Sequence, residues 1–171
     1  QRQMCIRDRN GSVSYYDKHH LFRYGGEDQF YEPGEEHTVV EYMGFRILLL
    51  TCYDLRFPEM IRKLALQGLD MLFVVSQWPK ERTFHLRTLT IARAIENQMF
   101  VVCCNSCGTD DCNTVGKTVY GGNSAIIEPF GKTLALAGEN EEIITAACDM
   151  QILSDIRGSI PVFRDRRPEL Y

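Results

Sequence analysis

The chain has 171 residues, of which 44% are hydrophobic and 25% are charged, and its formal net charge is -4. This length suits one domain with its own core, and the composition is that of an ordinary globular protein rather than of a disordered chain. A mildly acidic chain without a basic run predicts neither nucleic acid nor an anionic membrane surface as a partner.

The N-terminal segment differs in character from the rest of the chain. Residues 1–9 show neither a helical nor a strand period and include three arginines. We interpret residues 1–9 as a tail foreign to the fold and place the domain at residues 10–171.

From residue 10 onward the elements of an α/β domain follow in order. Asn10-Gly11 predicts a turn, residues 13–16 a strand, and residues 23–36 a loop. Residues 39–42 and 45–50 predict a hairpin whose second strand is nearly all apolar, as expected of a strand covered on both faces. A helix at 58–67 and a buried strand at 71–76 follow, and such a unit predicts parallel strands with a right-handed crossover. The later elements are a helix at 81–97, a covered strand at 99–105, an antiparallel pair at 123–128 and 133–137, a strand at 142–148 and a short helix at 150–157.

Cys52 lies immediately after the buried strand 45–50, and Pro58 marks the first turn of the next helix. A turn between a strand and a helix exposes the sulfur of a nucleophile and points backbone N–H groups at the same space. Position alone is equally consistent with a Cys52 that is merely packed.

The chain has seven cysteines, and four of them fall between Cys103 and Cys112. An odd count in a domain of this size predicts free thiols in a reducing cytoplasm rather than a disulfide scaffold. A zinc site at 103–112 is the alternative, but a structural site needs two ligand pairs, and the second pair would have to share Cys107. We therefore predict no metal and no cofactor.

Five segments together resemble the nitrilase, or carbon–nitrogen hydrolase, superfamily, and they stand in the family's order over residues 10–171. The segment 51–59 (TCYDLRFPE) is similar to the nucleophile motif, and 16–22 (YDKHHLF) is similar to the lysine motif upstream of it. The other three are 92–98 (ARAIENQ), 122–131 (GNS to PFG) and 160–171 (IPVF to RPELY).

The resemblance implies a catalytic set of glutamate, lysine and cysteine with a second, assisting glutamate. Lys18 and Cys52 match two of these positions. Glu27 matches the assisting glutamate by its place before the aromatic-x-Pro-Gly run, and Glu32 is the rival. The resemblance also implies an oxyanion hole formed by the Lys18 ammonium and the backbone N–H of Tyr53.

The general base of this set belongs upstream of the lysine, and residues 1–17 contain no glutamate. Asp17 adjoins Lys18 in a strand and faces the other way. We therefore expect an N-terminally truncated copy that lacks the first strands and helices of the family's α-β-β-α sandwich of mixed sheets. We also expect the chain as given to be inactive.

Other residues near these motifs have less specific interpretations. Asp54, Arg56 and Glu59 are expected to brace the turn after Cys52 by charge-assisted hydrogen bonds. Arg93 and Glu96 are expected to be structural. Trp78 either forms a wall of the substrate pocket or fills the core, because a buried indole needs a partner for its N–H in both cases.

The function that the resemblance implies is hydrolysis of a small linear amide to acid and ammonia through a Cys52 thioester. The segments 16–22, 26–34 and 76–79 are most similar to omega-amidases, which act on monoamides of 2-oxo dicarboxylic acids. An N-carbamoyl amidase, a true nitrilase and a non-catalytic fragment or assembly module are the alternatives. The resemblance further implies a homodimer or larger assembly of the complete protein, located in the cytoplasm.

Overall fold

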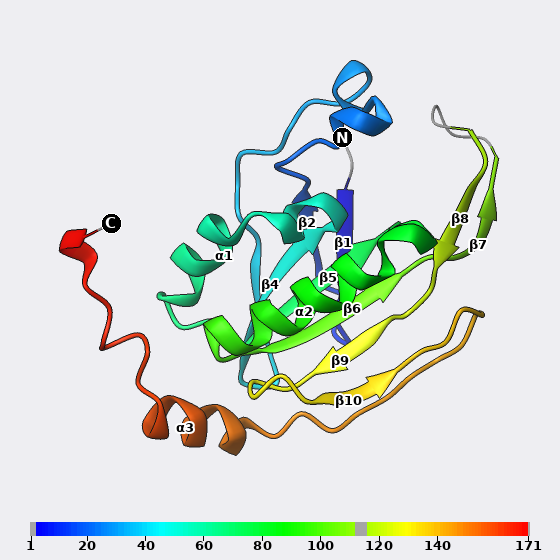
Figure 1. Ribbon diagram of the computed structural model, residues 1–171. Helices are drawn as coiled ribbons and strands as arrows, with labels where there is room; N and C mark the ends of the chain where they lie inside the picture. The colour runs from blue at the N-terminus through cyan, green and yellow to red at the C-terminus, as the bar shows by residue number, and fades with distance from the viewer. Residues whose placement is uncertain (1–2, 112–115, 171) are drawn as a thin grey trace.

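The computed structural model describes residues 3–111 and 116–170. Its centre is a six-stranded mixed sheet with the strand order β10-β9-β6-β5-β4-β3 (Figure 1). The neighbouring pairs β4–β5 and β5–β6 are parallel, whereas β3, β9 and β10 run antiparallel to their neighbours. The strands are β3 (Val39–Tyr42), β4 (Phe45–Thr51), β5 (Met71–Ser76), β6 (Phe100–Asn105), β9 (Ala125–Ile127) and β10 (Thr133–Leu136).

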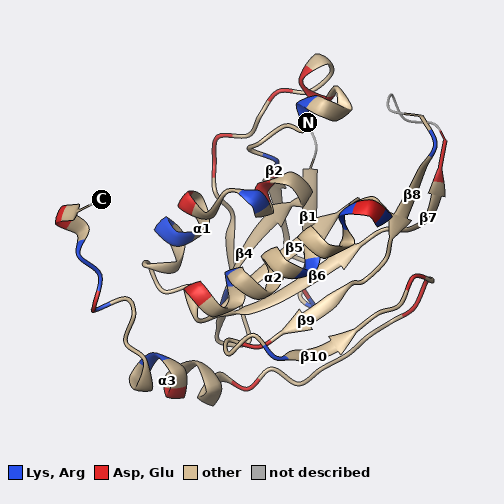
Figure 2. Ribbon diagram, viewed as in Figure 1, with Lys and Arg blue, Asp and Glu red and all other residues tan. Residues whose placement is uncertain are grey.

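Helices connect the parallel strands and cover one face of the sheet. The helix α1 (Pro58–Ala65) joins β4 to β5 and buries Ile61, Leu64 and Ala65, the apolar stripe at helical spacing. The helix α2 (Thr83–Asn97) joins β5 to β6 and follows a short 3-10 turn at Lys80–Arg82. In Figure 2 the strands β5 and β6 are uncharged along their whole length, as burial between two layers requires.

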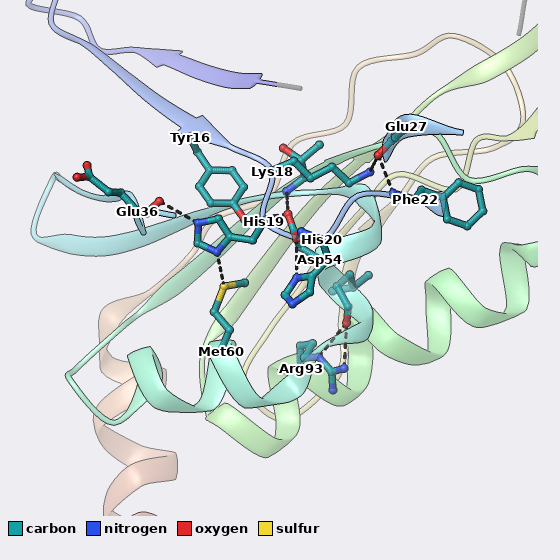
Figure 3. Close-up of polar contacts among 12 residues, drawn as sticks. Tyr16, Lys18, His19, His20, Phe22, Glu27, Glu36, Asp54, Met60 and Arg93 are labelled. Carbon is teal, nitrogen blue, oxygen red and sulfur yellow. Dashed lines mark hydrogen bonds and ion pairs between the residues drawn. The ribbon is translucent and has the colours of Figure 1, made fainter. Parts of the chain in front are cut away.

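A two-stranded antiparallel ribbon packs on the other side of β4. It consists of β1 (Gln3–Arg7) and β2 (Val13–Asp17), paired from Gln3↔Asp17 to Arg7↔Val13. In Figure 3 this ribbon and the helices lie on opposite sides of the sheet. Met4 and Tyr16 belong to the same hydrophobic core as β4. The expectation that residues 1–9 lack regular structure is therefore wrong, because Met4 supplies an apolar contact that holds a strand in place. That these residues are foreign to the gene stays a prediction.

The structure also differs from the sequence-based expectations after β6. A hairpin of β7 (Cys107–Asp110) and β8 (Thr118–Gly121) lies between the predicted strands at 99–105 and 123–128, where the sequence predicted no strand. The expected strand at 142–148 is wrong, because no residue there pairs with a neighbouring strand. Ile143 in this segment is 93% exposed. An extended segment becomes a strand only where a partner offers its backbone groups.

The remaining elements are short. The expected loop at 23–36 contains two 3-10 turns, Arg23–Gly25 and Glu27–Gln29, and a third, Cys52–Arg56, follows β4. The chain ends with α3 (Met150–Ser159) and the 3-10 turn Pro168–Leu170. Within the described residues, every helix is too short or too polar to cross a bilayer.

Candidate active site

Cys52 sits on a sharp turn at the carboxyl end of β4. Its φ is 52°, in the left-handed region that side chains other than glycine rarely adopt. It is also the first residue of the 3-10 turn Cys52–Arg56, and Pro58 then opens α1. A strained turn between strand and helix is the setting that presents a nucleophile at the edge of a sheet.

The carboxylate of Asp54 holds this turn. Asp54 is fully buried, and it accepts hydrogen bonds from the Tyr16 hydroxyl at 2.8 Å and the Thr51 backbone N–H at 3.2 Å. One of its oxygens also accepts the His20 backbone N–H at 2.9 Å and lies 2.9 Å from His20 Nδ1 (Figure 3). Burial and the nearby Asp54 carboxylate raise the pKa of Tyr16 well above its ordinary value. The expected bracing role of Asp54 is confirmed, and it ties the nucleophile turn to the segment that carries Lys18.

Lys18 and Glu27 form a buried ion pair. Lys18 Nζ lies 2.6 Å from Glu27 Oε2, and the Lys18 side chain is only 1% exposed (Figure 3). The same carboxylate oxygen accepts the Phe22 backbone N–H at 2.8 Å. Glu32, the rival candidate, is exposed. The structure thus brings Glu27, and not Glu32, to the lysine.

Gly34 closes the loop over this pair. Its backbone N–H donates to the Lys18 carbonyl oxygen at 2.9 Å. A Cβ at this position would overlap the backbone of Asp17, so the close approach of the two segments requires glycine.

A cavity of about 650 Å³ opens at the carboxyl ends of β4, β5 and β6. Cys52 and Glu27 both line it, as do Ser76, Asn105 and the exposed Cys104. The carboxyl ends of parallel strands are where open α/β sheets bind their ligands. The nucleophile candidate and the partner of Lys18 therefore face one ligand-sized space.

Trp78 lies next to this cavity rather than in its wall. Trp78 is 3% exposed and lines a smaller adjoining pocket together with Cys52 and Tyr53. Asn105 fixes the backbone of this loop, because its Oδ1 accepts the Trp78 N–H at 2.7 Å and its Nδ2 donates to the Trp78 carbonyl at 3.3 Å. Within the described residues the indole N–H has no acceptor.

Tyr53 is the second residue of the turn that starts at Cys52. Backbone N–H groups in the first turn of a helix have no acceptor within the helix, which is the property an oxyanion donor needs. The Tyr53 ring packs against Phe22 at 5.1 Å and Phe57 at 5.2 Å between ring centroids. These two ring contacts help to hold Tyr53 in place.

The arginines near the turn have two different roles. Arg93 donates from Nε and Nη2 to the Leu55 carbonyl at 3.1 and 2.9 Å and pairs with Glu96 at 2.7 Å, so its structural role is confirmed. Arg56 instead lies over the Trp78 ring at 4.4 Å and approaches His85 Nδ1 at 3.3 Å. Sequence reasoning missed Arg82, which lines both pockets, because neither its spacing nor its neighbours in the chain mark it.

The cysteines of β6 point to opposite sides of the sheet. Cys103 is buried, and burial raises the pKa of its thiol to about 12. Cys104 faces the cavity. Cys112, the last member of the alternative zinc site, lies outside the described residues. The described residues contain no group of three potential metal ligands.

The chain is similar to known proteins over most of its length. The family model described as carbon–nitrogen hydrolase matches residues 1–157. The chain is 42% identical over 169 residues to a 2-oxoglutaramate amidase of Bacillus subtilis, covering 98% of this chain and 63% of the relative. It is 40% identical over 158 residues to the omega-amidase YafV of Escherichia coli K12, covering 91% of this chain and 59% of the relative.

Among solved structures, the chain superimposes on XC1258 of Xanthomonas campestris, a CN-hydrolase superfamily protein with an arsenic adduct in its active site. The TM-score is 0.88 at 34% sequence identity, over 96% of this chain and 63% of that one. This chain therefore spans less than two thirds of the length of each of these three relatives. Because the family model matches residues 1–157, which is most of the chain, the chain belongs to the carbon–nitrogen hydrolase family.

Proposed function

We propose that this protein hydrolyses a small linear amide to an acid and ammonia through a thioester on Cys52. The substrate class we propose is the monoamides of 2-oxo dicarboxylic acids. The relatives named omega-amidase and 2-oxoglutaramate amidase support this choice. The observation that carries the proposal is that Cys52, on a strained turn, shares a cavity with Glu27. The Glu27 carboxylate in turn forms an ion pair with the buried Lys18.

The proposed reaction runs in two halves. A general base takes the Cys52 proton, the thiolate attacks the amide carbon, and the Lys18 ammonium and the Tyr53 N–H stabilise the oxyanion. Each such donor contributes about 3–4 kcal/mol to the transition state. The nitrogen leaves as ammonia with the proton, and water then cleaves the thioester to release the acid. Glu27 orients Lys18, since a buried ammonium needs a paired carboxylate.

The general base is assigned by the family resemblance to a glutamate upstream of Lys18, and residues 1–17 contain none. Glu27 already binds the Lys18 ammonium and the Phe22 N–H. We therefore propose that the 171-residue chain by itself releases no ammonia from 2-oxoglutaramate. Such release, lost in Cys52→Ala, would show that another group serves as the base.

The nucleophile is tested with a substrate that needs no general acid or base. At alkaline pH the thiolate forms without help, and p-nitrophenyl acetate carries a leaving group that departs unprotonated. We expect one acetyl group on Cys52, located by peptide mass spectrometry, and none there in Cys52→Ala. Lys18→Gln should slow acetylation by about 100-fold, the effect of removing one oxyanion donor.

The matched control is Lys63→Gln, which removes a charge from an exposed position on α1. It should acetylate at the rate of the unmodified chain. Equal rates for Lys18→Gln and Lys63→Gln, with both variants folded, would remove Lys18 from the proposed oxyanion hole.

The proposal also covers the assembly of the complete protein and its location. A homodimer or larger assembly of the complete protein is supported by exposed apolar side chains such as Phe84, at 75%, and Ile143, at 93%. A cytoplasmic location is supported by the free thiols of Cys5, Cys104 and Cys107.

A further inference from the structure

Two guanidinium groups meet at the small pocket beside Cys52. Arg56 lies over the Trp78 ring, 4.4 Å from its centroid. Arg82 lies 5.4 Å from the ring centroids of both Phe22 and Tyr24. Burial and the charge of Arg82 lower the pKa of Arg56, as expected of two like charges held close together.

Neither guanidinium has an ion-pair partner among the described residues. By contrast, the buried Arg93 binds Glu96 at 2.7 Å and the partly buried Arg157 binds Asp70 at 3.0 Å. Aromatic faces orient a guanidinium but leave its charge uncompensated. The pocket edge therefore carries two positive charges that no carboxylate of the described residues neutralises.

The small pocket suits one anionic group. Its volume is about 40 Å³, and no Asp or Glu is among the described residues that line it. It adjoins the larger cavity, since Cys52, Phe22 and Arg82 line both. The Trp78 indole N–H in its wall is buried and has no acceptor within the described residues. The larger cavity differs, because Glu27 and Glu81 are among its lining residues.

We propose that Arg82, with Arg56 beside it, binds the free carboxylate of a substrate whose amide carbon is attacked at Cys52. This subsite restricts the enzyme to amides that carry an anionic group a few bonds from the amide. Arg82 is then a residue that determines specificity and does not take part in the covalent steps. The identity of the substrate rests on the proposed function, whereas the carboxylate subsite is argued from the geometry of the pocket alone.

The test compares two alkylating reagents of similar size, the anionic iodoacetate and the neutral iodoacetamide. The Cys52 thiolate attacks the iodomethylene carbon of either reagent and iodide leaves, so the ratio of the two rates cancels any change in thiolate content. The ratio is measured by peptide mass spectrometry on the full chain, on Arg82→Gln and on Arg87→Gln. Arg87 is the matched control, since it is exposed on α2 and lines neither pocket.

We expect Arg82→Gln to lower the iodoacetate-to-iodoacetamide ratio about tenfold, from the loss of one close cation in a partly screened site. Arg87→Gln should leave the ratio unchanged. An unchanged ratio in Arg82→Gln overturns the inference. Equal slowing of the reactions of Cys52 with both reagents also overturns it, because Arg82 would then act on the Cys52 thiolate and not on the anion.

A second measurement needs no variant and covers the case in which Arg82→Gln fails to fold. 2-Oxoglutarate should protect Cys52 of the unmodified chain from iodoacetamide, whereas its neutral dimethyl ester should not. Equal protection by both compounds overturns the inference. Failure of the proposed function alone gives a different result. Cys52 is then not acetylated, but the iodoacetate-to-iodoacetamide ratio still falls in Arg82→Gln.

Discussion

Replacing Asp54 by alanine tests whether one buried carboxylate organises the nucleophile turn. The side chain is fully buried and accepts the Tyr16 hydroxyl, the Thr51 N–H and the His20 N–H. Asp54→Ala removes the acceptor of three donors, of which the Tyr16 hydroxyl and the Thr51 N–H are buried and the His20 N–H is partly buried. We expect the variant to lose both stability and the defined geometry of Cys52.

The magnitude follows from the contacts. A buried donor left without an acceptor costs about 1–3 kcal/mol, and three such losses in one network overlap, so we expect about 3–5 kcal/mol. This is a large share of the roughly 5–15 kcal/mol by which domains are stable. Tyr16→Phe is the matched control, because it removes one donor together with its hydrogen bond and should cost only about 1 kcal/mol.

The assay is urea unfolding followed by the fluorescence of Trp78, the only tryptophan in the chain. The double variant Asp54→Ala/Tyr16→Phe should be less destabilised than the sum of the single variants, because one unpaired donor is then gone. In Asp54→Ala, the acetylation rate of Cys52 should also become the same as that of exposed thiols. The reasoning is refuted if Asp54→Ala costs no more than Tyr16→Phe.

Two further predictions concern buried groups near the sheet. The pKa of Cys103 is raised from 9.0 to about 12 in the folded chain, so its contribution to stability is complete below pH 9 and declines as pH rises from there toward 12. The unfolding free energy should therefore fall by up to about 1.4 kcal/mol per pH unit in this window, and urea titrations at several pH values should show a shallower fall in Cys103→Ala. Arg93→Leu should leave the Leu55 carbonyl unpaired and cost about 2–3 kcal/mol by the same unfolding assay, whereas Arg87→Leu should cost less than 0.5 kcal/mol; equal costs would contradict the role of Arg93.

Local sequence patterns were sufficient for most of the central sheet. The apolar run before Cys52, Pro58 at the start of the helix and the stripe at Ile61 and Leu64 all reflect periodicity within a few residues. Such periodicity records burial directly, because each side chain's face follows from its position in the element. The pattern failed at 142–148, since strand propensity does not supply a partner strand.

The sequence alone also determined the order of the family motifs, and through them Cys52, Lys18 and Glu27 as candidates. Only the tertiary structure decided which glutamate reaches Lys18 and that Asp54 ties the nucleophile turn to the lysine segment. It also placed Arg82 beside Cys52, in a small pocket that no Asp or Glu of the described residues lines. These relations join residues that lie far apart along the chain, and such contacts depend on how the sheet, loops and helices pack rather than on any local period.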